Sequence, residues 1–369
     1  MTVVFAGGGT GGHLYPAIAV ADALRRRGAR IAFVGSADRL EKHIVPAADY
    51  VLHTIASHAL PRRPSLRTIR AATSNLIGIV QSLRILARVR PDLVIATGGY
   101  VCFPVALAAR IRRSAGLSRA RIVLLEANVS PGLTTRLLSG IVDEIWGECG
   151  GFSRAARAKC RPTGVPVRYR AESLPPRSEA ATRLGLDPLL QTVLGLGGSQ
   201  GAHSINEAFL RVVRARELPS GWQILLVTGS ADYDRVREHA AGTKGFVVVP
   251  YLDTMADAYA AADVVVARAG ASTLAELNAL RKPAILIPYP HATENHQAEN
   301  AQRVVATGRA VTIRDSELPD GRLGVVLADV LVPSRLAELA GGASETVADD
   351  SLDRILARVD TLVRGKSEP

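Results

Sequence analysis

The sequence contains few cysteines and few aromatic residues, and both shortages exclude classes of protein. Its three cysteines, Cys102, Cys149 and Cys160, are widely spaced and form no C-x-x-C pair. We therefore expect neither a disulfide framework nor a zinc ribbon, and a reducing compartment fits this cysteine usage. Aromatic residues make up only 4% of the chain, which argues against a stacking platform for single-stranded nucleic acid.

The sequence also shows no pattern typical of a targeting segment or of a membrane-spanning helix. Residues 1–9 have neither a basic start nor a long apolar core, and glycines interrupt them from Gly7 onward, which argues against a signal peptide. The most apolar stretch, Ala256–Ala269, is interrupted by three charged residues. We therefore expect no transmembrane helix.

The chain does contain enough apolar sequence for packed cores, and its charge is strongly asymmetric. Its 369 residues are 47% hydrophobic, which is typical of about two globular domains. The net charge is +11, and residues 1–168 hold 24 Lys and Arg against 9 Asp and Glu, whereas residues 169–369 hold 21 against 25. The basic half is expected to meet nucleic acid, a membrane surface or a phosphorylated substrate.

Short apolar strands alternate with amphipathic helices along most of the chain. A strand at Val3–Ala6 precedes a helix at Pro16–Arg27, and the rhythm restarts with a strand at Thr192–Leu196 and a helix at Ser204–Arg216. Such alternation predicts parallel sheets with right-handed crossovers. Two such series predict an α/β protein made of two doubly wound, Rossmann-like domains.

The same pattern predicts where the domains begin and end. Residues 1–168 form the predicted N-terminal domain, and residues 169–188, rich in Pro, Ser, Glu and Arg, read as a linker. Residues 189–330 form the predicted C-terminal domain. Residues 331–369 are expected to be a helical tail that packs across a surface or returns to the N-terminal domain.

Each series opens with a strand followed by a glycine-rich turn, Gly7–His13 in the first and Gly197–Ala202 in the second. Glycine lets the backbone approach a ligand closely, and the helix that follows offers free N–H groups to an anion. Either turn alone is equally well read as a tight connection. Two turns opening two parallel sheets favour a ligand in a cleft between the domains.

Gly7, Gly9 and Gly12 also satisfy the G-x-G-x-x-G pattern of dinucleotide-binding folds. Such folds need an acid at the end of the second strand to bind the ribose. Here that strand ends in Gly35-Ser36, and the first acid, Asp38, lies beyond it. We therefore disfavour a nicotinamide cofactor.

A third helix start at Gly270–Glu276 has two interpretations. Ser272 or Thr273 followed by Glu276 resembles a capping box. Alternatively, the helix N-terminus receives a phosphate while Glu276 accepts hydrogen bonds from ribose hydroxyls. The only D-x-D pattern, at Asp232–Asp234, lacks a full ligand set and is not expected to bind a catalytic metal.

Arg62–Arg121 holds twelve arginines and a single acid, Asp92. Within it, an apolar stripe and a basic set alternate at helical spacing: Leu66, Ile69, Leu76, Val80 and Leu83 against Arg67, Arg70, Arg84 and Arg88. One reading is a core-packed helix with a solvated arginine face. The other is a basic amphipathic helix that docks onto anionic lipid.

Seven motifs occur in an order that resembles glycosyltransferase family 28, and specifically its N-acetylglucosaminyltransferases that act on the lipid-linked muramyl-pentapeptide precursor of peptidoglycan. They lie at Gly8–His13, Thr97–Tyr100, Pro162–Arg168, Gly197–Ala202, Pro250–Met255, Arg268–Glu276 and His296–Ala301. The resemblance implies the GT-B fold, with acceptor and membrane binding on residues 1–168 and UDP-N-acetylglucosamine (UDP-GlcNAc) on residues 189–330. It further implies a peripheral protein on the cytoplasmic face of the bacterial plasma membrane, with no cofactor, no metal and no nucleic-acid partner.

The resemblance also implies roles for particular residues. Donor contacts would come from Arg168 and Ser199 near the diphosphate, Leu252 at the uracil, Ala271, Ser272, Thr273, Leu274, Ala275 and Glu276 at the nucleotide, and His296 and Gln297 at the sugar. Thr10, Gly11 and Gly12 would line the cleft. Two family patterns are altered, since Leu125-Glu126-Ala127-Asn128 keeps only Glu126 and Asn128 of H-E-Q-N, and Val165 replaces an asparagine.

The implied reaction is inverting, with the C4 hydroxyl of the muramic acid sugar attacking the anomeric carbon of N-acetylglucosamine. His13 is the first candidate for the general base because it follows the glycine turn and imidazole has a suitable pKa. Glu126 is the alternative base, and His13 then only orients the turn. The rival functions are a UDP-GlcNAc epimerase, another nucleotide-sugar glycosyltransferase, a nicotinamide-dependent oxidoreductase and an inactive membrane scaffold.

Overall fold

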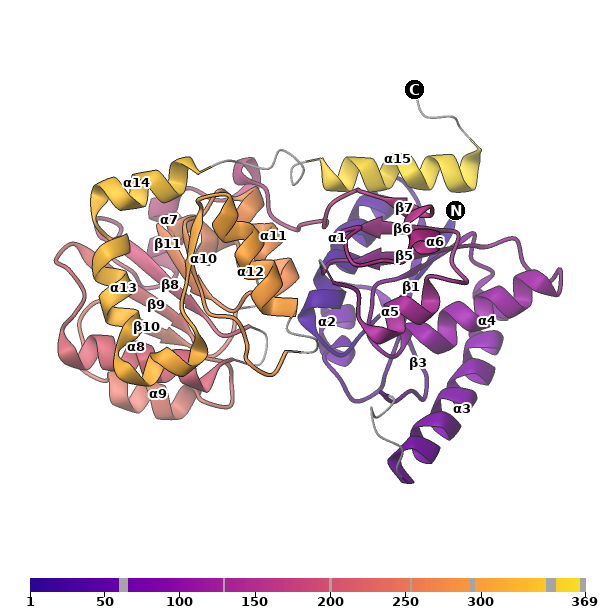
Figure 1. Cartoon of the computed structure of the whole chain (residues 1–369), viewed down its shortest axis with the longest axis horizontal. Coiled ribbons are helices and arrows are strands. Elements are labelled where there is room, and N and C mark those ends of the chain that lie inside the picture. The colour runs from indigo at the N-terminus through magenta and orange to yellow at the C-terminus, as the bar shows by residue number, and fades with distance from the viewer. Residues whose placement is uncertain are drawn as a thin grey trace. The chain divides into compact units, whose positions relative to one another are not determined.

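The computed structural model describes residues 1–59, 66–128, 130–198, 201–252, 254–292, 296–342 and 350–365 (Figure 1). The chain forms two compact units. The N-terminal unit comprises Met1–Arg168 together with the C-terminal stretch from Val347, and the C-terminal unit runs from Tyr169 to Thr346.

The N-terminal unit is built on a parallel sheet with strand order β3-β2-β1-β4-β5-β6-β7. Its strands are β1 (Thr2–Ala6), β2 (Arg30–Gly35), β3 (Val51–Thr54), β4 (Leu93–Ala96), β5 (Arg121–Glu126), β6 (Glu144–Gly147) and β7 (Cys160–Arg161). Its helices are α1 (Gly11–Arg26), α2 (Glu41–Ala47), α3 (Leu66–Val89), α4 (Cys102–Ser114), α5 (Leu133–Leu138), α6 (Arg154–Arg157) and α15 (Ser351–Arg364).

Both faces of this sheet are buried, which explains why β1 and β4 read as continuous apolar runs. Successive residues of β1 point to opposite faces. Val3 and Phe5 pack in one cluster with residues of α1 and α15, whereas Val4 and Ala6 pack in another with residues of α3 and α4. Alternate residues of β1 therefore pack against different helices on the two faces of the sheet.

The C-terminal unit repeats this plan with strand order β10-β9-β8-β11-β12-β13. Its strands are β8 (Gln191–Leu196), β9 (Trp222–Val227), β10 (Phe246–Val249), β11 (Val264–Ala267), β12 (Ala284–Leu286) and β13 (Ala310–Thr312). Its helices are α7 (Arg177–Arg183), α8 (His203–Ala215), α9 (Tyr233–Ala240), α10 (Ala256–Ala261), α11 (Ala271–Ala279), α12 (His296–Ala306), α13 (Arg322–Val330) and α14 (Pro333–Gly341), with 3-10 turns η1 (Ala171–Ser173) and η3 (Asp315–Asp320).

Residues 169–188, for which the sequence predicted a linker, are folded into the C-terminal unit. Helix α7 packs against α10, and the Arg183 guanidinium donates to both carboxylate oxygens of Asp257. Ala180 and Ala181 are buried in the core of this unit. These apolar residues are too few among the polar ones to reveal a helix from the pattern alone.

The predicted helical tail divides between the two units. Helix α14 packs on α13 in the C-terminal unit, whereas α15 packs on α1 in the N-terminal unit. Arg358 of α15 reaches the buried carboxylate of Glu144 on β6. Within the described ranges, no helix is both long and apolar enough to cross a lipid bilayer.

Candidate active site

The strand order of the N-terminal sheet reverses between β1 and β4, and the predicted residues gather at this point. The glycine turn follows β1, the Thr97–Tyr100 turn follows β4, and Glu126 ends β5. These three strands are neighbours and parallel, so their carboxyl ends lie at one edge of the sheet. Ligands of doubly wound sheets bind at such a reversal.

The glycines of the first turn are required by close packing. A Cβ atom at Gly7 would lie 2.1 Å from Thr97 Oγ1, and one at Gly8 would lie 2.2 Å from Glu41 Oε1. Gly9 adopts a φ of 87°, which favours glycine. The turn therefore presses against both the β4 turn and α2, and it delivers Thr10 as the exposed N-cap residue of α1.

Glu41 on α2 binds the glycine turn of the candidate site, and no motif in the sequence predicted this contact. Its side chain is fully buried, and its carboxylate accepts hydrogen bonds from the backbone N–H of Gly9 at 3.0 Å and from the N–H and hydroxyl of Ser36 at 2.9 and 2.6 Å. It ties the glycine turn to the end of β2. The sequence shows only one acid at the start of a short helix, and the hydrophobic periodicity did not predict that helix.

His13 lies in the first turn of α1, beside the turn that follows β4. A Cβ atom at Gly98 would lie 2.4 Å from His13 Nδ1, so the imidazole rests directly on that glycine. Two residues further on, the ring of Tyr15 lies 5.2 Å from the guanidinium carbon of Arg168. Cation–π contact thus holds the exposed Arg168 over the start of α1. Gly11, Gly12, His13 and Arg168 therefore belong to one neighbourhood.

Glu126, the alternative base, is 4% exposed at the end of β5. Its Oε1 atom accepts hydrogen bonds from both the backbone N–H and the side-chain amide of Asn128, each at 2.9 Å. The two residues kept from the H-E-Q-N pattern thus bind each other. This contact orients Asn128 at the edge of the sheet.

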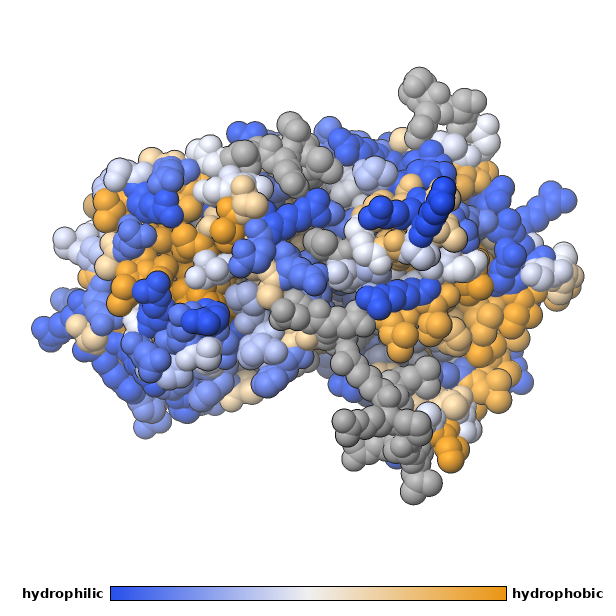
Figure 2. Space-filling view, viewed as in Figure 1, coloured by the Kyte–Doolittle hydropathy of each residue, from blue (hydrophilic) through white to orange (hydrophobic). Residues whose placement is uncertain are grey.

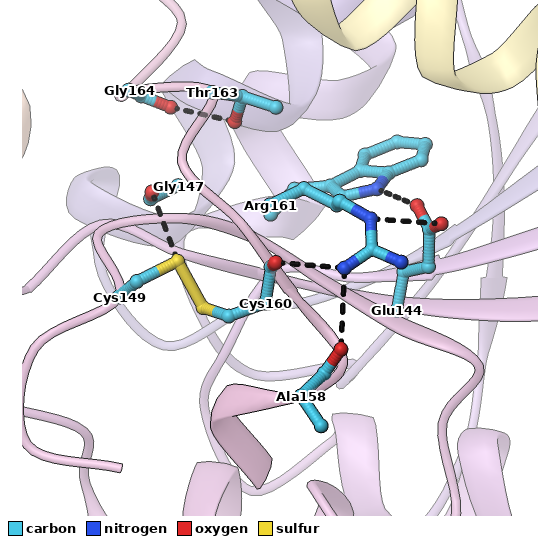
Figure 3. Close-up of a disulfide and its surroundings, with 9 residues drawn as sticks. Glu144, Gly147, Cys149, Ala158, Cys160, Arg161, Thr163 and Gly164 are labelled. Atoms are coloured by element: carbon cyan, nitrogen blue, oxygen red, sulfur yellow. Dashed lines mark hydrogen bonds and ion pairs between the residues drawn. A yellow bond between two sulfur atoms is a disulfide. The ribbon is translucent and has the colours of Figure 1, made fainter.

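The structure contains one disulfide, although the cysteine spacing predicted no disulfide framework. Cys149 and Cys160 are bonded, with an S–S distance of 2.08 Å and Cα atoms 6.0 Å apart (Figure 3). The spacing did not reveal this bond, because the pairing of β6 and β7 brings together the loop after β6 and the start of β7. Cys102 is a free thiol among the described residues, and burial raises its pKa to about 12.

Glu144, next to the disulfide in Figure 3, is a buried carboxylate with several donors. It accepts from Trp146 Nε1 at 2.8 Å, lies 3.4 Å from Arg161 Nε and pairs with Arg358. Such a carboxylate fixes β6, β7 and α15 to one another. It belongs to the frame of the N-terminal unit, not to the edge that carries His13.

The C-terminal sheet reverses between β8 and β11. The predicted donor residues of this unit follow β8, β10, β11 and β12 in the chain. The turn after β8 contains Ser199, which lies outside the described residues. Gly201 of the same turn has a φ of 77°, and a Cβ atom there would lie 2.1 Å from the carbonyl oxygen of Thr228. The turn thus packs against the end of the neighbouring strand β9.

Helix α11 begins at Ala271, directly after β11, with Gly270 as its N-cap residue. The cap is thus the glycine, and neither Ser272 nor Thr273 occupies that position. Ala271, Ser272, Thr273 and Ala275 are half-buried, whereas Leu274 is buried in the core. Leu274 can therefore offer a nucleotide only its backbone.

Glu276 lies one turn into α11 and is 9% exposed. Its Oε2 atom accepts a hydrogen bond of 2.6 Å from the hydroxyl of Tyr259 on α10. Gln297, in the first turn of α12, accepts at 2.9 Å from the backbone N–H of Tyr289, and His296 opens the same helix. Leu252 follows β10 and packs partly against the core.

The D-x-D pattern has a structural explanation. Asp232 accepts from Arg235 Nε at 2.7 Å and from Asn206 Nδ2 at 2.8 Å. The hydrogen bond from Arg235 is the main cause that lowers the pKa of Asp232 to about 2. Asp234 pairs with Arg237. In the part of the chain that the structure describes, no three His, Cys, Asp or Glu side chains are grouped as a metal site would need.

Two doubly wound units, each with a glycine turn at the reversal of its sheet, define a two-domain enzyme of the GT-B type. The crystal structure of MurG from Acinetobacter baumannii has this fold, with a TM-score of 0.69 at 23% identity, covering 99% of both chains. A putative UDP-N-acetylglucosamine 2-epimerase from Listeria monocytogenes also has it, with a TM-score of 0.66 at 15% identity, covering 100% of this chain and 98% of the other.

Sequence comparison narrows this class to one family. Residues 3–146 match the glycosyltransferase family 28 N-terminal domain, and residues 192–354 match its C-terminal domain. The chain belongs to glycosyltransferase family 28 and is a glycosyltransferase.

Curated relatives carry a specific name: UDP-N-acetylglucosamine–N-acetylmuramyl-(pentapeptide) pyrophosphoryl-undecaprenol N-acetylglucosamine transferase. The protein of that name from Chlorobium limicola is 38% identical, covering 99% of this chain and 100% of its own length. Its counterpart from Halothermothrix orenii is 40% identical and covers 90% of both chains.

Proposed function

We propose that this glycosyltransferase moves N-acetylglucosamine from UDP-GlcNAc to the C4 hydroxyl of N-acetylmuramic acid in pyrophosphoryl-undecaprenol-linked muramyl-pentapeptide, with inversion. The product is the disaccharide-bearing lipid precursor of peptidoglycan, so the reaction is a step of cell-wall synthesis. The main support is the named relative that aligns with 99% of the chain. The reversal points of both sheets carry residue types that suit this chemistry.

We assign most contacts of the donor nucleotide to the C-terminal unit, and one contact to Arg168 of the N-terminal unit. The N-terminus of α11 offers backbone N–H groups to a phosphate, and Glu276 accepts from the ribose hydroxyls. Gln297 and His296 bind the sugar hydroxyls, and the backbone of Leu252 binds the uracil. Arg168 and the turn that contains Ser199 draw negative charge from the leaving diphosphate.

We assign the acceptor chemistry to the N-terminal unit. His13 takes the proton from the C4 hydroxyl, the oxygen attacks the anomeric carbon, and the bond to UDP breaks. Glu126 is the alternative base, although it already accepts from Asn128. Thr10, Gly11 and Gly12 supply a hydroxyl and backbone N–H groups beside the reacting centre.

One surface of the N-terminal unit has the composition expected of a membrane-binding surface. Eight large apolar side chains on or beside α3, α4 and α5 are between 43% and 66% exposed: Ile69, Leu76, Ile77, Val80, Ile111, Leu117, Leu133 and Leu137. Figure 2 shows an apolar area over this side of the unit. Arg70, Arg84, Arg88 and Arg110 are exposed on the same helices. Apolar side chains flanked by arginines suit the cytoplasmic face of an anionic bilayer.

The predicted apolar stripe on α3 therefore does not pack in the core as a whole. Leu83 is half-buried, but Ile69, Leu76 and Val80 are exposed. The buried face of α3 instead includes Ala71, Ser82 and Leu86. This arrangement favours the lipid-docking interpretation of the basic helix.

Release of UDP from UDP-GlcNAc tests the proposed reaction. With lipid-linked muramyl-pentapeptide present, we expect UDP and a disaccharide lipid in equal amounts, and almost no UDP without the acceptor. A UDP-GlcNAc epimerase would act on the donor without any acceptor. Acceptor-independent turnover would therefore contradict the transferase and support the epimerase.

A further inference from the structure

Glu276, the carboxylate assigned above to the ribose, receives a hydrogen bond from a tyrosine to which the proposed mechanism gives no role. The hydroxyl of Tyr259 lies 2.6 Å from Glu276 Oε2. Tyr259 is on α10, seventeen positions before Glu276, and its side chain is only 2% exposed. A phenol hydroxyl buried this deeply needs a partner, because desolvating it without one is unfavourable.

The ring of Tyr259 is held in place by its neighbours. Tyr169 meets it edge-on, with ring centroids 5.7 Å apart and planes at 68°. The Tyr169 hydroxyl accepts at 3.0 Å from the backbone N–H of Met255, the N-cap residue of α10. Leu274 and Leu277 of α11 belong to the same core cluster. The Tyr259 hydroxyl therefore has little freedom to leave Glu276.

We infer that Tyr259 is a positioning residue for donor recognition: by donating to Oε2 it fixes the Glu276 carboxylate so that the site distinguishes a ribonucleoside diphosphate from its 2′-deoxy analogue. The inference rests on the proposed function, which places the ribose at Glu276. A carboxylate has about four lone-pair positions, so it accepts from Tyr259 and from a sugar hydroxyl together. Tyr259 never touches the nucleotide in this scheme.

The rival explanation is that Tyr259 only fills the core. The two roles differ in what Tyr259→Phe does, because phenylalanine keeps the ring and removes only the hydroxyl. A packing role predicts equal effects on every nucleotide. A positioning role predicts that the variant loses discrimination at the 2′ position.

The experiment measures dissociation constants for UDP and 2′-deoxyuridine diphosphate by calorimetry. We expect the wild type to prefer UDP by about tenfold or more, since a hydrogen bond to a charged group is worth roughly that factor. Tyr259→Phe should reduce the preference to about threefold or less, mainly by weakening UDP. Tyr169→Phe is the matched control, because it keeps the ring that meets Tyr259 edge-on and removes a hydroxyl that bonds to the backbone of Met255. It should leave the preference unchanged.

A double-mutant cycle separates action through Glu276 from a general loss of fold. In a Glu276→Gln background, Tyr259→Phe should no longer change the affinity for UDP, because residues that act through one contact are not additive. Full discrimination in the single variant, or an undiminished effect in the Gln background, would overturn the inference. A wild type that binds no UDP would refute the proposed function itself. If the wild type binds both nucleotides equally, Glu276 does not recognise the ribose 2′-hydroxyl, and the role inferred for Tyr259 is also wrong.

Discussion

The two units share a fold but carry different candidate residues after their strands. In each sheet the first strand is central, and the order reverses between the first and fourth strands of that unit. The candidate catalytic residues His13 and Glu126 belong to the N-terminal unit, whereas Glu276 and Gln297, assigned to the donor, belong to the C-terminal unit. Residues 1–168 are strongly basic and residues 169–369 are mildly acidic. The comparison teaches that sheet topology fixes where a site forms, while the residues after each strand decide its chemistry.

The largest expected effect is a loss of kcat, and it tests the catalytic role proposed for the N-terminal unit. Replacing His13 by Ala should lower kcat by about 10²–10⁴-fold, the usual contribution of a general base. The KM for UDP-GlcNAc should change little, because the nucleotide contacts are assigned to residues other than His13. Steady-state kinetics with both substrates measures this split.

A loss of less than about tenfold would show that His13 is not the base. Glu126→Gln is the parallel variant. If Glu126 is the base instead, that variant takes the large loss in kcat, and His13→Ala shows only the smaller effect of a displaced turn.

Reversing charge on α3 should have the next largest effect, on membrane binding rather than on turnover. Arg70, Arg84 and Arg88, all changed to Glu, should weaken binding to phosphatidylserine-rich vesicles by about 100-fold or more, given about 1 kcal/mol per basic residue near the surface. Vesicle co-sedimentation at two salt concentrations measures the change.

The matched control reverses three exposed basic residues of the C-terminal unit, Arg214, Arg237 and Lys244. Binding should then change only slightly. If both sets weaken binding equally, net charge decides the interaction and no particular face of the N-terminal unit is responsible.

Glu276→Gln tests the C-terminal half of the comparison. We expect KM for UDP-GlcNAc to rise about 10–100-fold, since a hydrogen bond to a charged group is worth roughly 1.5–3 kcal/mol. The value of kcat should fall much less. Glu207→Gln, which removes a carboxylate paired with Arg235 in the same unit, should leave KM unchanged. A fall confined to kcat would place Glu276 outside donor binding.

Substitution of Glu144 should lower the stability of the N-terminal unit without changing substrate binding. Glu144→Gln removes the charge that pairs with Arg358 and Arg161. Breaking a buried ion pair costs about 3 kcal/mol or more, so the melting temperature should fall by roughly 6–12 °C. Differential scanning calorimetry measures this, and KM values at a temperature below melting should be unaffected. A shift under about 2 °C would show that the pair contributes little.

The smallest expected effect depends on pH and belongs to the C-terminal unit. Because the pKa of Asp232 is lowered to about 2, its carboxylate stabilises the fold above pH ~4 and loses that contribution as pH falls toward 2. Asp232→Asn should therefore lower the melting temperature by about 2 °C at pH 7. The difference from wild type should shrink between pH 4 and 2. A difference that does not depend on pH would indicate lost hydrogen bonds rather than lost charge.

Much of the site could be predicted because its residues sit in local motifs. The glycine turns and the start of α11 follow apolar strands directly, so strand position also placed His13 and Glu276. Glu41 and Tyr259 could not be found this way. Each acts across the fold. Glu41 binds a turn 32 positions earlier, and Tyr259 binds a residue of another helix that it meets only in the folded unit.

The sequence by itself determined the alternation of strands and helices, the two glycine turns and the basic character of the first half, because periodicity and composition are local properties. Only the tertiary structure decided that Cys149 meets Cys160, that α7 joins the C-terminal unit and that α15 joins the N-terminal unit. It also decided which face of α3 is exposed. The physical reason is that these outcomes depend on which surfaces compete for burial, and that competition is settled only once the sheets have formed.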